Sequence, residues 1–147
     1  MKAVIQRVSA SSVRIDGEVV GSIGRGYTIL LGVMQGDTQE DIDKLVRKIV
    51  KLRLFPDECG KFDKSIADIG GEALVVSQFT LAAKLKKGNR PDFTEAMRPA
   101  EAKVLYETFV ARLSEHIPVQ TGVFGAMMEV SILNDGPVTI VADSKTL

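Results

Sequence analysis

The run from Tyr27 to Met34 constrains the fold of this chain more than any other segment. Its side chains are apolar on both faces of an extended strand, and it contains the longest uninterrupted apolar stretch, Ile29–Met34. A strand of this kind must be covered on both sides, which predicts a central position in a sheet. The stretch is far shorter than the ~20 residues that a transmembrane helix needs, so we expect no membrane span.

Further strands are expected before and after this run. Two short strands, Val4–Val8 and Val13–Ile15, precede Asp16-Gly17, a pair that tolerates the positive φ angles of a tight hairpin turn. Periodicity and turn residues then predict strands over 18–23, 52–55 and 72–77. A terminal hairpin of 127–133 and 138–141 is expected around Asn134-Asp135-Gly136-Pro137.

Two helices complete the expected elements. Thr38-Gln39-Glu40-Asp41 resembles a capping box. After it, apolar residues recur at the spacing of one helical face: Ile42, Leu45, Val46 and Ile49. A second helix begins near Pro99 and has ended by Pro118, because proline suits a first helical turn but not an interior. The 147 residues are therefore expected to form one α/β mixed domain of the α+β type, 1–147, with mostly antiparallel strands and two main helices.

Charge and sulfur content narrow the function classes. Nineteen Lys and Arg side chains balance nineteen Asp and Glu side chains, which excludes a strongly basic binder of bulk nucleic acid. The single Cys excludes an internal disulfide, and one Cys with one His cannot build a zinc site from such ligands, so we expect no metal. A cytoplasmic location is expected, because polar and charged residues follow Met1 too soon for a signal peptide.

The familiar catalytic motifs are missing. The sequence has no Walker A loop and no Gly-x-Ser-x-Gly elbow. His116 is the single imidazole base, but it lies at the predicted end of the second helix, where a cationic His stabilises the helix dipole. Cys59 follows Asp57 and Glu58 and has no neighbouring cation that would activate its thiol. Neither His116 nor Cys59 is expected to be catalytic.

Two polar segments remain as candidates. Ser77-Gln78-Phe79-Thr80-Leu81 lies where a buried strand runs out into hydroxyl and amide groups, which a rigid scaffold would hold in place. Asn134-Asp135-Gly136-Pro137-Val138-Thr139 combines turn residues with polar side chains. Residue chemistry alone favours an ordinary loop start for the first segment and an ordinary hairpin turn for the second.

Taken together, the two segments resemble the D-aminoacyl-tRNA deacylase family, the D-tyrosyl-tRNA deacylases. Four further segments agree, in order along the chain: Ile5–Val8, Leu30–Val33, Gly88–Pro91 and Gln120–Gly122. The resemblance covers essentially the whole chain. It implies the fold of that family, with a barrel-like sheet, and hydrolysis of the ester that joins a D-amino acid or glycine to the 3′ end of tRNA.

The resemblance also implies a homodimer without metal or organic cofactor, in which each active site lies at the subunit interface. The catalytic pocket is then expected to be lined by Ser77, Gln78, Phe79 and Thr80. The segment Gly136-Pro137 of the other subunit, joined by a cis peptide bond, is expected to enter that pocket. The residues that support this segment are expected to be Arg7, Asn134 and Thr139.

A mechanism follows from the resemblance and from elementary chemistry. Main chain at Gly136-Pro137 is expected to occupy the direction in which an L side chain would point, which excludes L-aminoacyl esters but not glycine. Backbone N–H groups near Phe79 and Thr80 are candidates for stabilising the tetrahedral intermediate. Thr80 as a nucleophile would need an activating base, which the sequence does not offer. Attack by water, oriented by the site and by the terminal ribose hydroxyl, is therefore preferred.

A basic cluster begins four residues after Thr80. We expect its side chains to contact tRNA phosphates: Lys84, Lys86, Lys87 and Arg90. Two alternatives to the enzyme are a catalytically silent dimer that binds RNA or a small ligand on the same fold, and a structural interaction protein. Hydrolysis of D- and L-tyrosyl-tRNA, compared side by side, separates these three functions.

Overall fold

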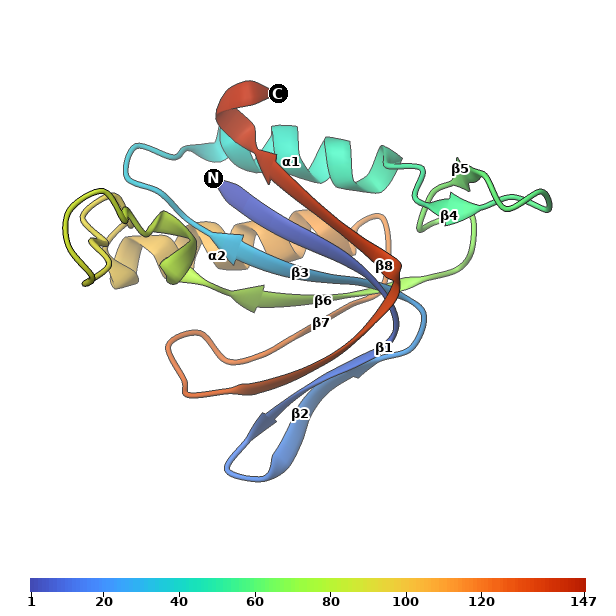
Figure 1. Ribbon diagram of the computed structural model, residues 1–147, viewed down its shortest axis with the longest axis horizontal. Coiled ribbons are helices and arrows are strands. Elements are labelled where there is room, and N and C mark those ends of the chain that lie inside the picture. The colour runs from blue at the N-terminus through green and yellow to red at the C-terminus, as the bar shows by residue number, and fades with distance from the viewer.

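The computed structural model describes residues 1–147 and shows a large sheet with two helices packed on one face (Figure 1). The strands are β1 (Lys2–Ile15), β2 (Glu18–Ile23), β3 (Gly26–Gly32), β4 (Phe55–Pro56), β5 (Phe62–Lys64), β6 (Glu72–Ser77), β7 (Val119–Thr121) and β8 (Glu129–Asp143). The helices are α1 (Gln39–Lys51) and α2 (Pro99–Ser114), and the short 3₁₀ turns are η1 (Phe79–Ala82) and η2 (Ser144–Thr146). Neither helix has both the length and the apolar character that a membrane crossing requires. The mixed α+β class with two main helices is confirmed.

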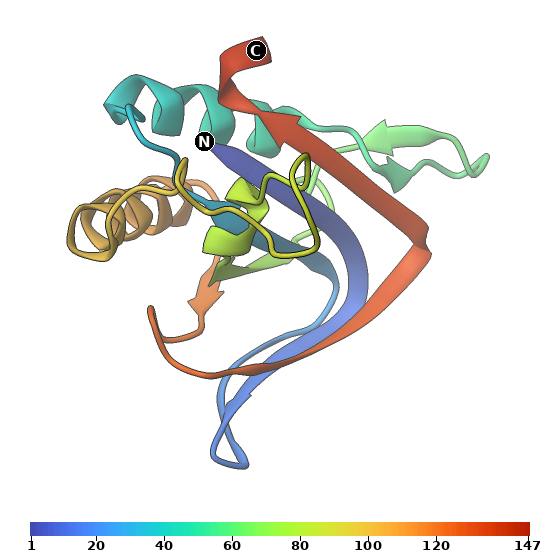
Figure 2. The same cartoon turned by 60° about the vertical axis from the view of Figure 1, so that its left-hand side comes forward.

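Strand β1 organises the large sheet because it pairs along both of its edges. One edge pairs with β3 from Lys2 to Val8 and then with β2 from Ser11 to Ile15, both antiparallel. The other edge pairs antiparallel with β8 from one end of β1 to the other. Figure 2 shows how β1 and β8 curve together, so that their far halves and β2 swing out below the rest of the sheet.

The prediction of a terminal hairpin over 127–141 is wrong. Glu129–Asp143 is one strand, and residues 134–138 make a bulge within it, where the pairing with β1 shifts register. The reason is the partner strand: β1 continues as one strand instead of the two short strands expected, so both halves of β8 find hydrogen bonds along it. The Asn134 side chain closes the bulge, since its oxygen accepts from the Val138 N–H (3.0 Å) and its amide donates to the Val138 carbonyl (3.2 Å).

The remaining strands make the large sheet mixed. β6 pairs in parallel with β3 and with β7, and the strand order is β2-β1-β3-β6-β7 with β8 on the outer edge of β1. The strand expected at 52–55 is reduced to β4, which pairs with β5 in a separate two-stranded sheet. β5 and β7 have three residues each. Strands this short show no recognisable alternation, so the sequence analysis did not find them.

Alternation along β3 and β6 builds two apolar layers. Tyr27, Ile29 and Leu31 of β3 are buried in a core of 22 residues that includes the inner faces of α1 and α2. Leu74 of β6 belongs to a smaller core of five buried residues, enclosed by the curled sheet, and Leu30 of β3 packs against it. Both faces of β3 are covered, which confirms the expectation from its apolar run.

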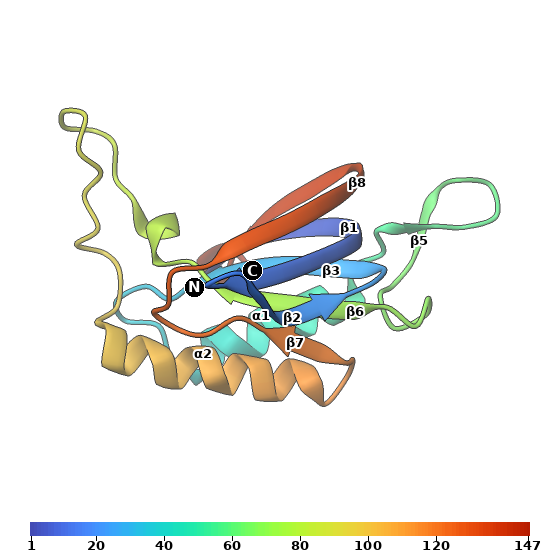
Figure 3. The same ribbon diagram turned by 90° about the horizontal axis from the view of Figure 1, so that it is seen from below.

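The large sheet is curled so far that β2 lies against β7 (Figure 3). This contact almost closes the sheet into a barrel. A Cβ atom on Gly21 of β2 would lie 2.5 Å from the carbonyl oxygen of Thr121 in β7. No real side chain tolerates that distance from main chain, so glycine is what allows the two strands to approach. The barrel-like sheet implied by the resemblance is confirmed.

The first turn of α1 belongs to a polar cluster around Asp41, which is buried. The Asp41 carboxylate accepts hydrogen bonds from the Thr38 N–H (2.8 Å), the Ser144 hydroxyl (2.6 Å) and the Lys145 ammonium group (2.9 Å). Burial alone raises the pKa of a carboxyl group, but the hydrogen bonds from Ser144, Lys145 and Thr38 and the charge of Lys145 outweigh it. The pKa of Asp41 therefore lies well below its usual range.

We expect Asp41→Asn to lower the free energy of unfolding at neutral pH by about 1.5–3 kcal/mol, because it removes a buried, charged hydrogen-bond acceptor. The carboxylate stabilises the wild-type protein above the pKa of an unfolded Asp, about 3.9, and this stability is lost as the pH falls towards the lower folded pKa. The variant should lose less stability on acidification than the wild type, measured by urea unfolding at a series of pH values. Glu40→Gln, an exposed acid on the same helix, is the control and should keep the wild-type acid profile. A similar change in both variants would contradict the role of Asp41.

Candidate active site

The segment Ser77–Thr80 begins where β6 ends. Ser77 is the last residue of β6 and lies opposite Leu31 of the parallel strand β3. The Gln78 N–H donates to the Leu31 carbonyl (2.8 Å), and the chain then leaves the sheet in the turn η1. β7 is parallel to β6 and ends on the same side, so the carboxyl ends of three parallel strands meet there. Ligands of sheets with parallel strands bind beyond this edge, which makes it the candidate site.

Two polar side chains of this segment contact each other. The Gln78 side-chain amide donates to the hydroxyl oxygen of Thr80, whose side chain is exposed. The N–H groups of Phe79 and Thr80 open the η1 turn and so have no acceptor within it. Two adjacent N–H donors beside a hydroxyl are suited to stabilising the oxyanion that develops when an ester is attacked.

The other titratable candidates lie apart from this segment. His116 borders a cavity of about 300 Å³ between α1 and α2, together with Arg112 of α2 and Asp43 of α1. Cys59 is exposed in the loop between β4 and β5, where its N–H donates to the Asp57 carboxylate (2.8 Å). No group of three or more His, Cys, Asp or Glu side chains is close enough together to hold a metal ion.

The second segment lies in the β8 bulge, where Arg7 of β1 contacts it. The Gly136–Pro137 peptide bond is cis, and Gly136 has a φ of +131°, a conformation that favours glycine. Arg7 is buried; its Nε donates to the Asp135 carbonyl (3.1 Å) and its Nη1 to the Leu54 carbonyl (2.6 Å). A Cβ atom on Gly136 would lie only 3.0 Å from Arg7 Nη2. Arg7 therefore packs directly against the glycine and holds the main chain next to it.

Sequence analysis did not identify two of the groups that hold this bulge in place. Leu54 contributes a main-chain carbonyl, and the Phe62 ring lies with its centroid 5.7 Å from the guanidinium carbon of Arg7. A main-chain contact leaves no signal in side-chain chemistry, and Phe62 lies in a three-residue strand far along the chain from Arg7. Asn134 and Thr139, which were predicted, contact each other through the Asn134 amide and the Thr139 hydroxyl (3.3 Å).

The two candidate segments do not meet within one chain. Arg7, beside the bulge, pairs with Tyr27, and Tyr27 pairs with Ala73 of β6. Ser77 is four residues further along β6, which corresponds to roughly 13 Å of strand at about 3.3 Å per residue. In Figure 1 the bend of β8 lies at the right of the sheet and the segment after β6 at its left. The structure therefore separates the two segments along the sheet.

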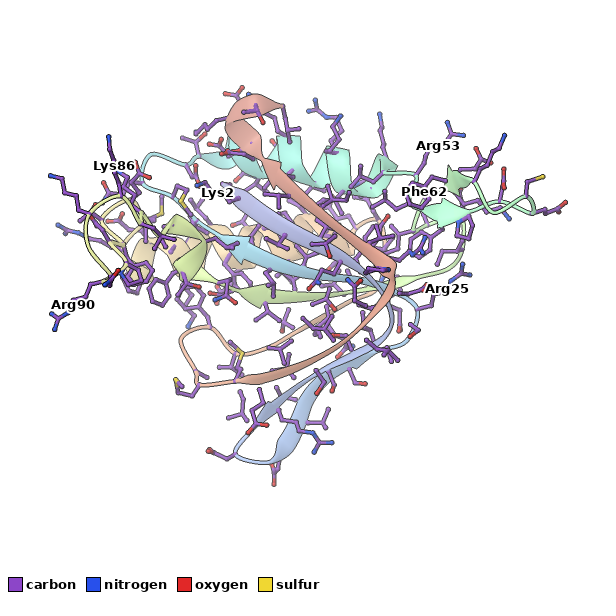
Figure 4. The ribbon with its side chains drawn as sticks, viewed as in Figure 1. Lys2, Arg25, Arg53, Phe62, Lys86 and Arg90 are labelled. Atoms are coloured by element: carbon purple, nitrogen blue, oxygen red, sulfur yellow. The ribbon has the colours of Figure 1, made fainter.

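The basic cluster lies on an arm that projects from the body of the protein beyond η1 (Figure 3). Two backbone hydrogen bonds between Lys84 and Asp92 (2.8 and 3.0 Å) close the arm at its base. Lys84 is ion-paired with Glu95 (2.8 Å), and the hydrogen bond to Glu95 with its charge raises the pKa of Lys84. The arm also carries three exposed cations that have no carboxylate partner, two of which Figure 4 labels: Lys86, Lys87 and Arg90.

Comparisons with known proteins show which family and which fold this chain is similar to. The family model described as D-Tyr-tRNA(Tyr) deacylase matches residues 4–143. Relatives from a Nitratiruptor species and from Persephonella marina, both named D-aminoacyl-tRNA deacylase, are 65% and 63% identical over 147 residues, with 100% of each chain covered. A solved structure of a c-Myc DNA Unwinding Element Binding Protein is 47% identical, with a TM-score of 0.93 over 97% of this chain and 98% of that one. A probable eukaryotic D-amino acid tRNA deacylase, 17% identical, shares the fold with a TM-score of 0.82 over the same shares.

Fold and comparisons together define an enzyme, a hydrolase of the ester bond in aminoacyl-tRNA. The chain belongs to the D-Tyr-tRNA(Tyr) deacylase family, which confirms the resemblance found in its sequence. The roles assigned to Ser77–Thr80, to Gly136–Pro137 and to the basic arm stay predictions.

We expect Arg7→Lys to lower the free energy of unfolding by about 1.5–3 kcal/mol, measured by urea titration, because an ammonium group cannot reach two separate carbonyls with the fixed geometry of a guanidinium. Arg14→Lys is the matched control on the same strand, since Arg14 is exposed and makes a single long contact with the Gly17 carbonyl (3.3 Å). Equal losses in the two variants would show that the Arg7 bonds to Asp135 and Leu54 contribute nothing specific.

Proposed function

We propose that this protein hydrolyses D-aminoacyl-tRNA and glycyl-tRNA in the cytoplasm, releasing the free amino acid and tRNA, and spares L-aminoacyl-tRNA. The observation that carries the proposal is the identity of 60–65% along the whole chain with proteins named D-aminoacyl-tRNA deacylase. The position of Ser77–Thr80 supports it, because exposed polar groups stand there on a rigid sheet edge.

Two copies of the chain are proposed to complete each other's sites. The β8 bulge lies too far along the sheet to reach Ser77–Thr80 of its own chain, which supports the proposal that Gly136–Pro137 would close the site of another copy. The outer edge of β8 supports a homodimer, because no strand pairs with it. Leu133 and Val141 on this strand are 63% and 74% exposed, and such apolar side chains on a free edge are suited to a partner chain.

Chiral selection is proposed to be steric. When the α-amino group and the ester of the substrate are both fixed, the side chain points one way in the D form and the opposite way in the L form. Main chain at Gly136 would occupy the L direction, and the hydrogen bonds of Arg7 would keep that main chain from moving aside. Glycine has no side chain to exclude, so glycyl-tRNA would also be cleaved.

Water is proposed to attack the ester carbon directly. The N–H groups of Phe79 and Thr80 would donate to the oxyanion of the tetrahedral intermediate. The Thr80 hydroxyl already accepts from Gln78, and the one His of the chain lies between the two helices, so no imidazole is at hand to activate Thr80 as a nucleophile. The terminal ribose hydroxyl of the tRNA is the remaining group that would orient the water.

The purified protein should hydrolyse D-tyrosyl-tRNA at least about 100-fold faster than L-tyrosyl-tRNA, since steric clashes give discrimination of this order. Gly136→Ala should reduce this ratio, because its new Cβ would lie 2.8 Å from Val138 Cγ2 and 3.0 Å from Arg7 Nη2 and would displace the main chain proposed to exclude an L side chain. The measurement is the loss of radiolabelled amino acid from each tRNA with time.

Gly17→Ala is the matched control, since Gly17 also has a positive φ but a Cβ there would meet no atom within 4 Å; its ratio should match the wild type. Equal hydrolysis of both esters would reject chiral selection. Binding of tRNA with cleavage of neither ester would favour the silent binding dimer, and the absence of any response to tRNA would favour a structural interaction protein.

Replacing both Lys86 and Lys87 by glutamine removes two positive charges. This double variant should have a raised KM for aminoacyl-tRNA and an unchanged kcat. The slope of log KM against log salt concentration should fall by about 1–2, because each phosphate contact contributes roughly one unit. Lys103→Gln is the control, since Lys103 lies on α2 beside Glu107 (3.9 Å). An unchanged salt slope in the double variant would reject the role of the arm in binding tRNA.

A further inference from the structure

The hairpin of β4 and β5 lies against Arg7, the residue that holds the main chain of the β8 bulge. Its two strands pair antiparallel, with Pro56 opposite Phe62. Phe62 is 56% exposed, although large apolar side chains are ordinarily buried. In Figure 4 Phe62 lies near the bend of β8, and its ring centroid is 5.7 Å from the guanidinium carbon of Arg7. The side chain of Arg7 is only 10% exposed, so an exposed ring lies over a buried cation.

The hairpin contacts Arg7 from both of its sides. On the incoming side, the carbonyl of Leu54, the residue before β4, accepts from Arg7 Nη1 (2.6 Å). On the returning side, Phe62 is the first residue of β5 and places its ring by the same guanidinium. Arg7 Nε then donates to the Asp135 carbonyl (3.1 Å) in the bulge. The hairpin therefore fixes the group that in turn holds the bulge.

The hairpin itself is firmly attached at its base. Phe55 of β4 is fully buried and its ring stacks on that of Tyr27 in β3, with the centroids 5.2 Å apart. Arg53 Nε donates to the Asp63 carbonyl (2.7 Å), and the Arg53 guanidinium is also ion-paired with the Asp63 carboxylate. Phe62 lies next to Asp63, so its exposed ring has a fixed support.

A ring in this position makes it costly for Arg7 to release the bulge. A guanidinium group is attracted to the face of an aromatic ring, and the attraction grows where water is excluded. The ring also shields the two hydrogen bonds of Arg7 from competing water, which strengthens them. To let the main chain at Gly136 move, Arg7 would have to give up the ring as well as its carbonyl partners.

We propose that Phe62 is a positioning residue for chiral selection: it restrains the Arg7 guanidinium and thereby keeps the main chain at Gly136 in place. This inference rests on the proposed function and adds to it a residue that acts through Arg7. An L-aminoacyl ester would be cleaved in the few molecules in which the Gly136 main chain has moved, whereas a D-aminoacyl ester needs no such movement. Phe62 should therefore control the hydrolysis of L esters and leave that of D esters unchanged.

Phe62→Leu tests this role, because it keeps an apolar side chain and removes the ring. Its kcat/KM for L-tyrosyl-tRNA should rise by about 2- to 30-fold, the factor that corresponds to the loss of one cation–π contact. Its kcat and KM for D-tyrosyl-tRNA should match those of the wild type. Phe62→Tyr, which restores an aromatic face, should hydrolyse both esters like the wild type. Lys64→Gln, at an exposed residue of the same strand, is the matched control and should do the same.

Hydrogen exchange of the Arg7 Nε–H, followed by NMR spectroscopy on the full chain, gives a readout that needs no substrate. This hydrogen exchanges when its bond to the Asp135 carbonyl opens, so Phe62→Leu should speed its exchange by the same factor as hydrolysis of the L ester. Phe62→Tyr and Lys64→Gln should leave the exchange rate at the wild-type value. The exposed Nε–H of Arg14 is the internal reference, and its exchange should be equal in all variants.

Unchanged exchange at Arg7 with unchanged L-ester hydrolysis in Phe62→Leu would overturn the role of Phe62. An equal fall in the hydrolysis of both esters would overturn it too, since the ring would then contribute to overall structure alone. A shift from dimer to monomer with unchanged exchange at Arg7 would show that the ring contacts a second copy instead. Equal hydrolysis of both esters by the wild type would reject the proposed function, and the exchange measurement would still decide whether Phe62 restrains Arg7.

Discussion

The pairing of β1 with β8 along its whole length is the constraint on which the rest of the structure depends. Because β1 is bonded on both edges, its bend is copied into β8, and the turn-forming residues of β8 become a bulge rather than a loop tip. The bulge brings Asp135 and Gly136 against Arg7 of the neighbouring strand. A true hairpin would have left the same glycine and proline at a free end, where nothing would hold the main chain rigid.

Parallel pairing decides where the chemistry can lie. β3, β6 and β7 run in one direction, so their carboxyl ends present Ser77–Thr80 at one edge while the β8 bulge stays near the middle of β1. The tight contact at Gly21 brings β2 against the last residue of β7. The candidate site therefore lies on a packed scaffold, next to the arm that carries the three cations without a carboxylate partner.

Local patterns in the sequence were enough to predict the elements that carry strong local signals. The apolar face Ile42–Ile49 correctly predicted a helix, and the capping residues Thr38 and Asp41 correctly predicted its start. The apolar run of β3 correctly predicted a central strand. The terminal hairpin was wrong because Asn134-Asp135-Gly136-Pro137 has the same composition in a turn and in a bulge, and only the partner strand decides between them. The separation of the two candidate segments was likewise beyond the sequence, since it follows from the parallel pairing of β3 with β6. The contacts of Arg7 with the Leu54 carbonyl and the Phe62 ring depend on tertiary position alone.

The guanidinium of Arg7 is anchored by two carbonyl groups of the peptide backbone. Every amino acid supplies such a group, so the side chain at position 54 is free to diverge during evolution without releasing the anchor, whereas the Asp135 carboxylate also lies 3.5 Å from Arg7 Nε. Arg7 and Gly136 are not free in this way, because one must supply the planar fork and the other must leave room for it. Selection should therefore act on this anchor at two positions that are far apart in the sequence, Arg7 and Gly136. Few pairs of positions around the anchor should vary together among related sequences.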